Sequence, residues 1–461
     1  MKFIIGTQKS RLVTDNPKII RALRDVYSAQ VPGARYSTLY RQGRWDGKKH
    51  FITKKGVFRT GLLSEIQSNL RSAGLEWDIE YKDSLPKSPN ISRINNYTYF
   101  DYQEEAITHA LSSQRCVIKA PTGAGKTLIM AGLVKSLIGK KMVILFNAKN
   151  LLKQTYDFLT EECGLENVGV CFGEGFIDGE IMLATVQSIE KIIDPYVAEA
   201  EVLMVDEVHE FSVGDTTVAA IESFPNAKFR YGFTATFPTE KIPRLNVIGA
   251  FGPVHICKTT HDLIEEGVLT KPIIQMLETS GQDFDDEGMS YLDIYTSAVV
   301  NNDYRNNQIL DVVEDIKSNN EQARILILVR SLEHGRILQE GIGGSCYFLR
   351  GEDDISSRYS TIRSFTECGD NSILIGTKIL QTGVNIREIT HFINARGLKS
   401  PIATIQALGR SLRRHDSKDV VFVYDFMDTG KYLGAHANKR LSTYVSEGHE
   451  VHKTKWKHPK K

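Results

Sequence analysis

The chain has little cysteine and no long hydrophobic run. Its six cysteines are few for 461 residues, and no two are spaced C-x-x-C. This scarcity excludes a disulfide-rich scaffold and argues against a zinc ribbon. No stretch approaches the roughly 20 apolar residues that span a bilayer, and the first ten residues turn polar too early for a signal peptide. We therefore expect a protein of reducing cytoplasm with no membrane partner.

The chain also has almost no net charge, because its formal charge is only +1. The charges are nevertheless unevenly distributed. Residues 1–90 hold 17 Lys and Arg against 8 Asp and Glu, residues 431–461 hold 8 against 2, and the acidic middle holds 32 against 46. Basic ends suit a polyanion such as nucleic acid, since binding releases counterions. An ordinary solvated surface explains the same pattern, so charge alone leaves both interpretations open.

The hydrophobic pattern predicts several domains. Residues Asp83–Ser92, with two prolines and three serines, are typical of a linker. Helices are expected before it at Pro17–Tyr27 and Leu62–Ala73, and after it at Lys126–Leu137 and Asn150–Cys163. Two sets of short apolar runs alternate with helical stretches after the linker, which predicts two parallel sheets covered on both faces. The predicted strands are Cys116–Ala120, Met142–Phe146, Ile181–Thr185, Val202–Asp206 and Arg230–Thr234, then Ile325–Val329, Cys346–Leu349, Ile373–Thr377, His391–Ala395 and Val420–Tyr424.

These patterns predict an α/β protein with a small α+β domain at its N-terminus. The expected boundaries are residues 1–88 for the small domain, 89–254 and 255–430 for the two α/β domains, and 431–461 for a basic C-terminal tail.

A phosphate-binding loop is predicted at residues 120–127, which read APTGAGKT between a strand and a helix. Glycines at 123 and 125 allow backbone N–H groups to close around phosphate oxygens, and the helix N-terminus adds partial positive charge. Lys126 would reach the β- and γ-phosphates, and Thr127 would hold Mg²⁺. Ala120 stands where the strict pattern has glycine, but the strand–loop–helix setting is kept.

Residues 206–209, DEVH, follow an apolar strand at the position expected for a metal and water site. Asp206 leaving a buried strand suits Mg²⁺, and Glu207 can orient and deprotonate the attacking water. His209 is either a hydrogen-bonded structural residue or a sensor of the second α/β domain.

The second α/β domain offers arginines and further polar loops. Gln406, Gly409, Arg410 and Arg413 share one face of a predicted helix, which suits recognition of a phosphoryl group or, alternatively, a basic surface. Thr377 and Gly383 follow a strand where a loop could touch phosphates or the nucleotide. In the first α/β domain, Thr234 and Thr236 end a strand and could link the nucleotide to a phosphate track.

Taken in order, these segments resemble the motifs of superfamily-two helicases. The resemblance covers residues 97–427 and implies two tandem RecA-like domains with ATP and Mg²⁺ between them. It implies that Tyr102 and Gln103 read adenine, that Thr122, Gly123, Ala124, Gly125, Lys126, Thr127 and Gly383 bind the nucleotide, and that Thr127 and Asp206 hold the metal. It further implies catalysis by Lys126, Asp206, Glu207, Arg410 and Arg413, coupling by His209, Thr234, Thr236 and Gln406, and nucleic-acid contacts from Lys149, Thr185, Arg330 and Thr377.

The N-terminal region narrows the resemblance. Residues 41–47, RQGRWDG, and 61–80 are similar to the small N-terminal domain of phage UvsW-type helicases, which act on forks, four-way junctions and R-loops. DEVH in the metal motif departs from that group. Arg44 and Trp45 lie in a cluster of cations and aromatics that can hold phosphates and stack on a base. Alternatively, Trp45 is the core of a small domain.

The resulting hypothesis is an ATP-dependent DNA helicase or translocase that remodels branched or forked DNA in phage recombination, repair or replication. RNA–DNA hybrid is a further expected substrate. We expect a monomer in the cytoplasm of a phage-infected host cell. The alternatives are an RNA helicase, a duplex translocase without strand separation and an ATP-gated clamp.

Overall fold

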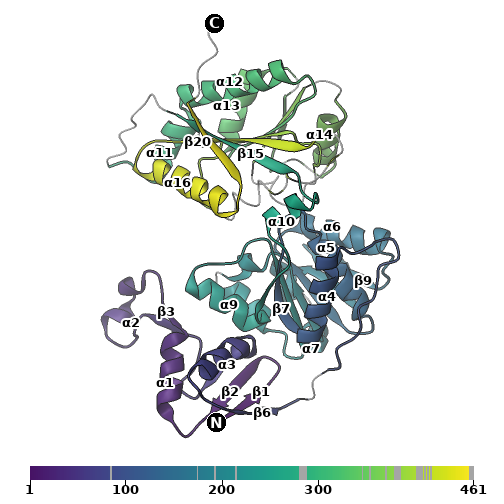
Figure 1. Cartoon of the computed structure of the whole chain (residues 1–461), viewed down its shortest axis with the longest axis vertical. Helices are drawn as coiled ribbons and strands as arrows, with labels where there is room; N and C mark the ends of the chain where they lie inside the picture. Colours follow the sequence, from purple (N-terminus) through teal and green to yellow (C-terminus); the bar gives the residue numbers. More distant parts are fainter. Residues whose placement is uncertain are drawn as a thin grey trace. The chain divides into compact units, whose positions relative to one another are not determined.

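The structure is a computed structural model that describes most of the chain in two units. The described residues are 1–83, 86–173, 175–191, 194–212, 215–279, 288–344, 346–351, 353, 355–368, 371–377, 386–400, 409, 412, 415 and 418–455. One unit comprises residues 1–120 and 125–258, and the other comprises 121–124 and 259–461. The first unit contains the N-terminal domain and the first α/β domain, and the second contains the second α/β domain (Figure 1).

The N-terminal domain is built on a four-stranded sheet in the order β5-β2-β1-β6. Alternate residues of β2 are buried, as expected for a sheet with one solvated face. A lobe of residues 28–50 projects from it and contains the two-stranded ribbon β3-β4. The elements are β1 (Lys2–Ile5), β2 (Lys9–Val13), α1 (Pro17–Val26), β3 (Ser28–Gln30), η1 (Ala34–Tyr36), α2 (Thr38–Arg41), β4 (Lys48–His50), β5 (Val57–Arg59), η2 (Thr60–Leu62), α3 (Leu63–Ser72) and β6 (Asp78–Tyr81).

The first α/β domain has an eight-stranded sheet in the order β10-β9-β11-β8-β12-β13-β7-β14, parallel except for β10. Its elements are α4 (Asp101–Ser113), β7 (Arg115–Lys119), α5 (Lys126–Ser136), β8 (Met142–Phe146), α6 (Lys149–Asp157), η3 (Phe158–Glu162), β9 (Val168–Phe172), β10 (Gly175–Ile177), β11 (Ile181–Thr185), η4 (Val186–Lys191), α7 (Asp194–Glu199), β12 (Val202–Val205), η5 (Val208–Ser212), α8 (Asp215–Glu222), β13 (Phe229–Thr234), α9 (Lys241–Phe251) and β14 (Val254–Ile256).

Helices cover both faces of this sheet, because its strands send alternate residues to opposite sides. On β8, Ile144 packs in one core with residues of α4, α5 and α6. Its neighbours Val143 and Leu145 pack in the other core with residues of α8 and α9. The parallel strands therefore have apolar residues on both faces, and their carboxyl ends meet at one edge.

The second α/β domain has a seven-stranded, all-parallel sheet in the order β17-β18-β16-β19-β20-β15-β21. One of its cores joins residues of α12 and α13 to β16, β18 and β19. The elements are α10 (Thr260–Glu265), β15 (Lys271–Glu278), α11 (Tyr291–Tyr295), η6 (Thr296–Val300), α12 (Asp303–Asn319), β16 (Arg324–Leu328), α13 (Leu332–Ile342), β17 (Cys346–Leu349), α14 (Ile355–Glu367), β18 (Ser372–Gly376), β19 (His391–Asn394), β20 (Val420–Met427), α16 (Lys431–Ser446) and β21 (Glu450–Lys455).

The predicted α/β class, and each strand predicted from an apolar run, is confirmed. The prediction of a basic C-terminal tail is wrong for residues 431–455. These residues fold as α16 and β21, and β21 pairs with β15 in the second sheet. Residues 456–461 lie outside the described residues. None of the described helices is long and apolar enough to cross a membrane.

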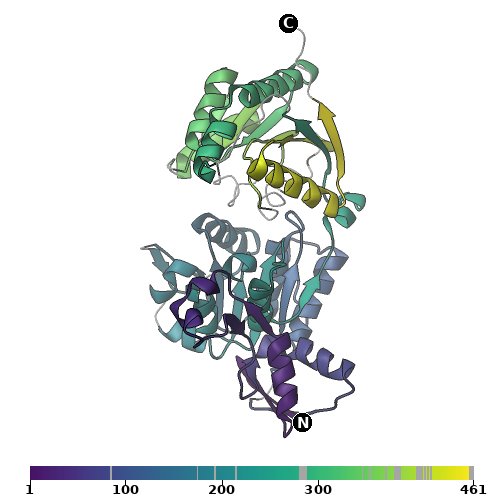
Figure 2. The same ribbon diagram turned by 90° about the vertical axis from the view of Figure 1, so that its left-hand side faces the viewer.

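The N-terminal domain and the first α/β domain share one hydrophobic cluster. Leu245 and Ile248 of α9 pack with Phe58, Leu62 and Ile66 of the N-terminal domain. A Cβ on Gly61 would lie 2.1 Å from the carbonyl oxygen of Ile248, so only glycine allows η2 to approach α9 this closely. Figures 1 and 2 both show the N-terminal domain beside the first α/β domain.

Candidate active site

The phosphate loop joins β7 to α5 at the carboxyl edge of the first α/β sheet. Gly123 and Gly125 have φ values of +89° and +78°, a backbone conformation that favours glycine. Gly125 caps α5, and Lys126 follows as its first residue. The Lys126 ammonium donates a hydrogen bond to the carbonyl oxygen of Ala120 at 3.2 Å, which holds the amine over the loop. This arrangement suits a phosphate chain, because backbone N–H groups and the helix N-terminus favour an anion.

Gln103 is brought against the phosphate loop by the first turn of α4. A Cβ on Gly125 would lie 2.4 Å from Gln103 Nε2. Gln103 Oε1 accepts a hydrogen bond from the backbone N–H of Phe100 at 3.0 Å, so its amide is oriented. Tyr102 is buried, and its ring stacks on Phe100 at 5.7 Å.

Phe100 was not predicted from the sequence, although its ring is 52% exposed beside this glutamine. The sequence signal that could have identified Phe100 is its position directly before α4, three residues from Gln103. An exposed ring at this point can stack on a base. The Tyr102 ring, in contrast, is buried with Phe100 stacked on it.

The residues after β12 form the acidic part of the site. The backbone N–H of Asp206 donates to the carbonyl oxygen of Leu145 at 2.9 Å. Burial raises the pKa of Asp206 well above its ordinary value, the charge of Glu207 raises it further, and Lys126 opposes both effects. Glu207 has a φ of +47°, which is strained for a residue with a Cβ and is typical of functional sites.

Asp206 and Thr127 suit Mg²⁺ bound together with a phosphate chain. Among the described residues no group of three or more His, Cys, Asp or Glu side chains could hold a metal by itself. Mg²⁺ needs no such group, because it is usually held by one or two protein oxygens, water and substrate phosphates. The Asp206 carboxylate and the Thr127 hydroxyl are oxygen ligands of this kind, so the residues fit the ion.

His209 ties the acidic motif to Thr234 at the end of β13. Its Nδ1 lies 2.8 Å from Thr234 Oγ1 and 3.3 Å from Glu207 Oε2. Thr234 Oγ1 donates to the carbonyl oxygen of Thr236 at 2.6 Å and accepts from the N–H of Thr236 at 3.2 Å. His209, Thr234 and Thr236 therefore lie together, as the coupling prediction requires, and His209 bonds within its own domain.

The predicted nucleic-acid residues are dispersed over the two units. Lys149 is exposed at the start of α6, with its ammonium 4.6 Å from the centre of the Phe172 ring. Thr185 is buried and its hydroxyl lies 2.9 Å from that of Ser188, so its side chain is turned away from solvent. In the second unit Arg330 is exposed, with its guanidinium 4.6 Å from the centre of the Tyr295 ring, and Thr377 is half-buried after β18. Gly383, Gln406, Arg410 and Arg413 lie outside the described residues.

The predicted nucleic-acid residues of the lobe differ in exposure. Arg44 is exposed, whereas Trp45 is half-buried and its indole N–H donates to the carbonyl oxygen of Lys48 at 3.0 Å. The indole N–H therefore helps to hold the lobe, while part of the ring stays accessible to solvent.

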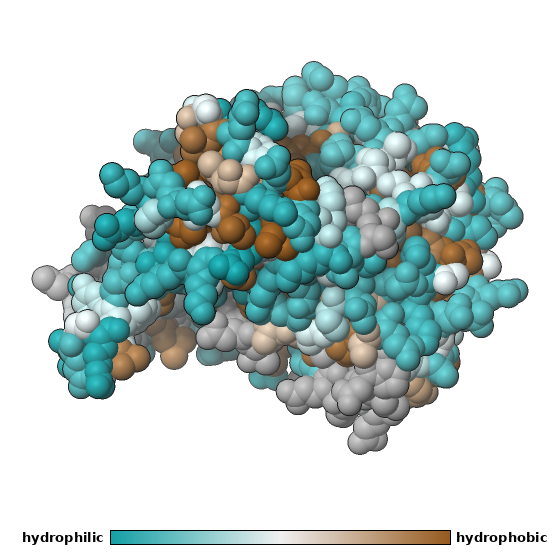
Figure 3. Space-filling model, turned by 90° about the horizontal axis from the view of Figure 1, so that it is seen from below, coloured by the Kyte–Doolittle hydropathy of each residue, from teal (hydrophilic) through white to brown (hydrophobic). Residues whose placement is uncertain are grey.

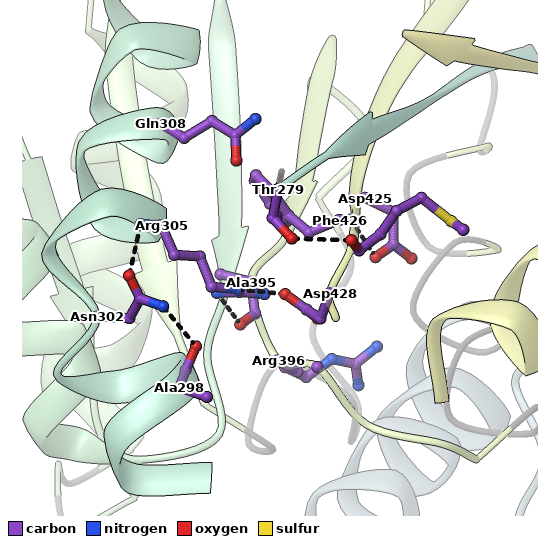
Figure 4. Close-up of polar contacts among 12 residues, drawn as sticks. Thr279, Ala298, Asn302, Arg305, Gln308, Ala395, Arg396, Asp425, Phe426 and Asp428 are labelled. Atoms are coloured by element: carbon purple, nitrogen blue, oxygen red, sulfur yellow. Dashed lines mark hydrogen bonds and ion pairs between the residues drawn. The ribbon is translucent and has the colours of Figure 1, made fainter. Parts of the chain in front are cut away.

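A buried charged network in the second α/β domain was not predicted. Arg305 Nε donates to Asp428 Oδ1 at 2.7 Å and its Nη1 donates to the carbonyl oxygen of Ala395 at 3.1 Å (Figure 4). Arg440 Nε donates to Asp425 Oδ1 at 3.0 Å. Fully buried charges need such partners. The network fixes the backbone at Ala395, directly after β19.

Comparisons with known proteins agree with this geometry. Residues 96–239 match the family of type III restriction enzyme res subunits, and residues 305–415 match the helicase conserved C-terminal domain. The chain is thus an ATP-dependent helicase of superfamily two, an ATP hydrolase with two RecA-like domains.

Among individual proteins, the chain is similar to the ATP-dependent DNA helicase UvsW of Enterobacteria phage T4. The two are 23% identical over 481 residues, which cover 92% of this chain and 93% of the relative. This match confirms the predicted resemblance to UvsW-type helicases.

Two solved structures share the fold. A fragment of a putative HsdR subunit of a type I restriction enzyme from Vibrio vulnificus aligns with a TM-score of 0.59 and 17% identity, covering 78% of this chain and 70% of that chain. Saccharomyces cerevisiae Dbp5 bound to RNA and ADP-BeF3 aligns with a TM-score of 0.53 and 13% identity, covering 77% and 93%. At these identities the likeness concerns the fold alone.

Proposed function

We propose that this helicase remodels branched DNA, namely forks and four-way junctions, and that the RNA–DNA hybrid of an R-loop is a further substrate. The observation that carries the proposal is the basic and aromatic lobe of the N-terminal domain, which is joined to the first α/β domain through α9. Similarity to a phage DNA helicase supports DNA over RNA. We further propose that the protein works in phage recombination, repair or replication, in the cytoplasm of an infected cell.

The lobe presents apolar side chains among cations. Tyr36 is 69% exposed, Leu39 52% and Tyr40 40%. The Arg35 guanidinium lies 4.8 Å from the centre of the Tyr36 ring. Aromatic rings stack on unpaired bases and neighbouring cations hold phosphates, in a way that depends little on sequence. Because Trp45 is half-buried, we assign base stacking to Tyr36 and Tyr40 and phosphate contact to Arg44. Figure 3, which looks at the molecule from below the view of Figure 1, shows a mainly hydrophilic surface with hydrophobic side chains scattered over it.

In the proposed mechanism, the phosphate loop and Lys126 bind and orient the triphosphate. Mg²⁺ held by Thr127 and Asp206 would neutralise charge on the β- and γ-phosphates. Glu207 takes the proton of the attacking water, and His209 holds the Glu207 carboxylate near Thr234. Arg410 and Arg413 are assigned to the charge that develops on the γ-phosphate, with Gly383 at the nucleotide and Gln406 in coupling. This assignment is supported by the resemblance.

The test compares ATP turnover and strand separation on a four-way DNA junction, a forked duplex, a linear duplex and duplex RNA, with the protein expected to act as a monomer. We expect the junction and the fork to be unwound well ahead of the linear duplex. A Tyr36→Ala, Tyr40→Ala double variant should lose this preference, whereas Tyr81→Ala, an exposed tyrosine of β6, should keep it.

Two outcomes would overturn the proposal. Equal or faster unwinding of duplex RNA indicates an RNA helicase. ATP turnover without strand separation on any substrate indicates a duplex translocase.

A further inference from the structure

Asn246 joins the N-terminal domain to the turn that follows the acidic motif. It lies on α9 and is 5% exposed. Its Oδ1 accepts a hydrogen bond from Arg59 Nη1 at 3.2 Å, and its Nδ2 donates to the carbonyl oxygen of Ser212 at 3.0 Å. Arg59 ends β5 of the N-terminal domain, and Ser212 ends η5, which begins directly after Glu207.

The contacts continue from Ser212 to the water-activating residue. Ser212 Oγ donates a hydrogen bond to the carbonyl oxygen of His209. His209 Nδ1 in turn lies 3.3 Å from Glu207 Oε2 and 2.8 Å from Thr234 Oγ1. An unbroken series of polar contacts therefore runs from the N-terminal domain to the residue that activates water.

Asn246 occupies a place where an apolar residue would otherwise be expected. Its neighbours on α9, Leu245, Val247 and Ile248, are all buried. A buried amide is costly unless both of its polar atoms are bonded. The side-chain oxygen of Asn246 accepts from the N-terminal domain, and its amino group donates to the first α/β domain. Both bonds are therefore made only while the two domains stay docked.

Arg59 is held so that a shift of β5 would reach Asn246. Its guanidinium also pairs with Glu222 at the end of α8. Its stem crosses Gly249, where an added Cβ would lie 3.1 Å from Arg59 Cδ. β5 follows the lobe along the chain, so residues 51–56 connect the lobe to the strand that ends in Arg59.

We infer that Asn246 is a positioning residue that couples DNA on the lobe to the acidic motif, and so sets how strongly branched DNA stimulates ATP hydrolysis. The inference rests on the proposed role of the lobe. Contiguity alone does not demonstrate coupling, so the test needs a matched contact in the same interface. The Arg244–Glu65 ion pair provides one, because it also joins α9 to the N-terminal domain and neither residue is bonded to η5 in the described hydrogen bonds.

The experiment measures the ratio of ATPase kcat with forked DNA to kcat without DNA in three variants. Asn246→Asp keeps the acceptor for Arg59 but replaces the donor to Ser212. Arg59→Met keeps the stem over Gly249 and removes the guanidinium. Glu65→Gln weakens the matched pair. We expect the first two to lower the ratio by about ten-fold with unchanged affinity for forked DNA, and Glu65→Gln to leave basal and stimulated rates as they are.

A second measurement separates this inference from the proposed function. Hydrogen exchange in residues 208–212 should speed up in Arg59→Met but not in Glu65→Gln, with no DNA present. Unchanged exchange there, or an equal loss of stimulation in Glu65→Gln, overturns the inference. If DNA fails to stimulate the unmodified enzyme, the proposed function fails, and the exchange result still decides whether Asn246 links the two sites.

Discussion

Lys126 is the side chain whose loss should separate hydrolysis from nucleic-acid binding. Its ammonium lies over the phosphate loop, where it donates a hydrogen bond to the carbonyl oxygen of Ala120. Lys126→Ala should lower ATPase kcat at least about 100-fold, because a preorganised charge at the transferred phosphoryl is lost, while affinity for forked DNA changes little. Steady-state ATPase and fluorescence anisotropy measure the two effects. Lys135→Ala, at the far end of the same helix, is the control, and full activity of pure Lys126→Ala would contradict the assignment.

Buried histidines should make the second α/β domain sensitive to mild acid. Burial lowers the pKa of His334 to about 3, with a smaller contribution from Arg305, and burial lowers that of His391 to about 4. Between their ordinary pKa near 6.5 and these values, the unfolded chain binds protons that the folded chain does not. Stability therefore falls as pH falls below about 6.5, by up to roughly 1.4 kcal/mol per pH unit for each such histidine.

The measurement is urea unfolding from pH 7 to pH 4.5. His334→Gln should make the dependence on pH shallower by about one proton. A slope that His334→Gln does not change would show that this imidazole is not buried in its neutral form.

At the level of single residues, the sequence allowed prediction of groups that sit in local motifs. Lys126 and Asp206 follow from short patterns next to a strand or helix end, whereas Gln103 follows from the resemblance to superfamily-two helicases. The structure places Gln103 against Gly125 of the phosphate loop and Lys126 near Asp206. The buried ion pair of Arg305 could not be predicted, because its carboxylate partner Asp428 is 123 residues away in the sequence. Asn246 and Phe100 carry no motif of their own, and their contacts exist only after folding.

Most strands that are buried on both faces were predicted, although β9, VGVCF, was not. Central strands such as β8 and β11 are continuous apolar runs, since each residue packs in one of two cores. β15 and β21 were not predicted, and their sequences give the physical reason. β15, KPIIQMLE, mixes polar residues with apolar ones, and β21, EVHKTK, is an edge strand with two lysines. Edge strands are commonly polar, because this prevents pairing with other chains, and polar strands give no hydrophobic signal.

At the level of elements, the contact of η2 with α9 should tolerate no side chain at Gly61. The added methyl group of Gly61→Ala would overlap the backbone of α9, which should lower the free energy of unfolding of the first unit by about 1–3 kcal/mol. Urea unfolding measures the change. Gly434→Ala in α16 is the control, because its Cβ would meet only backbone atoms of Asp428 and Thr429, at 3.5 and 3.9 Å. A stable Gly61→Ala protein would mean that η2 does not lie against α9.

At the scale of the whole molecule, the uneven charge has a structural counterpart. Much of the basic excess of residues 1–90 lies in a domain that is not a detachable module, because Leu245 and Ile248 of α9 complete its core. Removing that domain would expose these side chains to water and would remove the partner of Asn246. Point variants therefore test the lobe, whereas a truncated chain would test stability.

The shared core predicts that the N-terminal domain and the first α/β domain unfold together, apart from the second unit. Trp77 contacts Phe3 in the shared cluster at 5.9 Å between rings, so its fluorescence reports the N-terminal domain. With Trp456 replaced by phenylalanine, the fluorescence transition in urea should coincide with loss of exchange protection in β8 and β12, because elements of one cooperative unit open together. The strands β16 and β18 should lose protection in a separate transition. If the fluorescence changes at lower urea than protection in β8, the N-terminal domain opens by itself, and motion of β5 could not reach the acidic motif through a rigid contact.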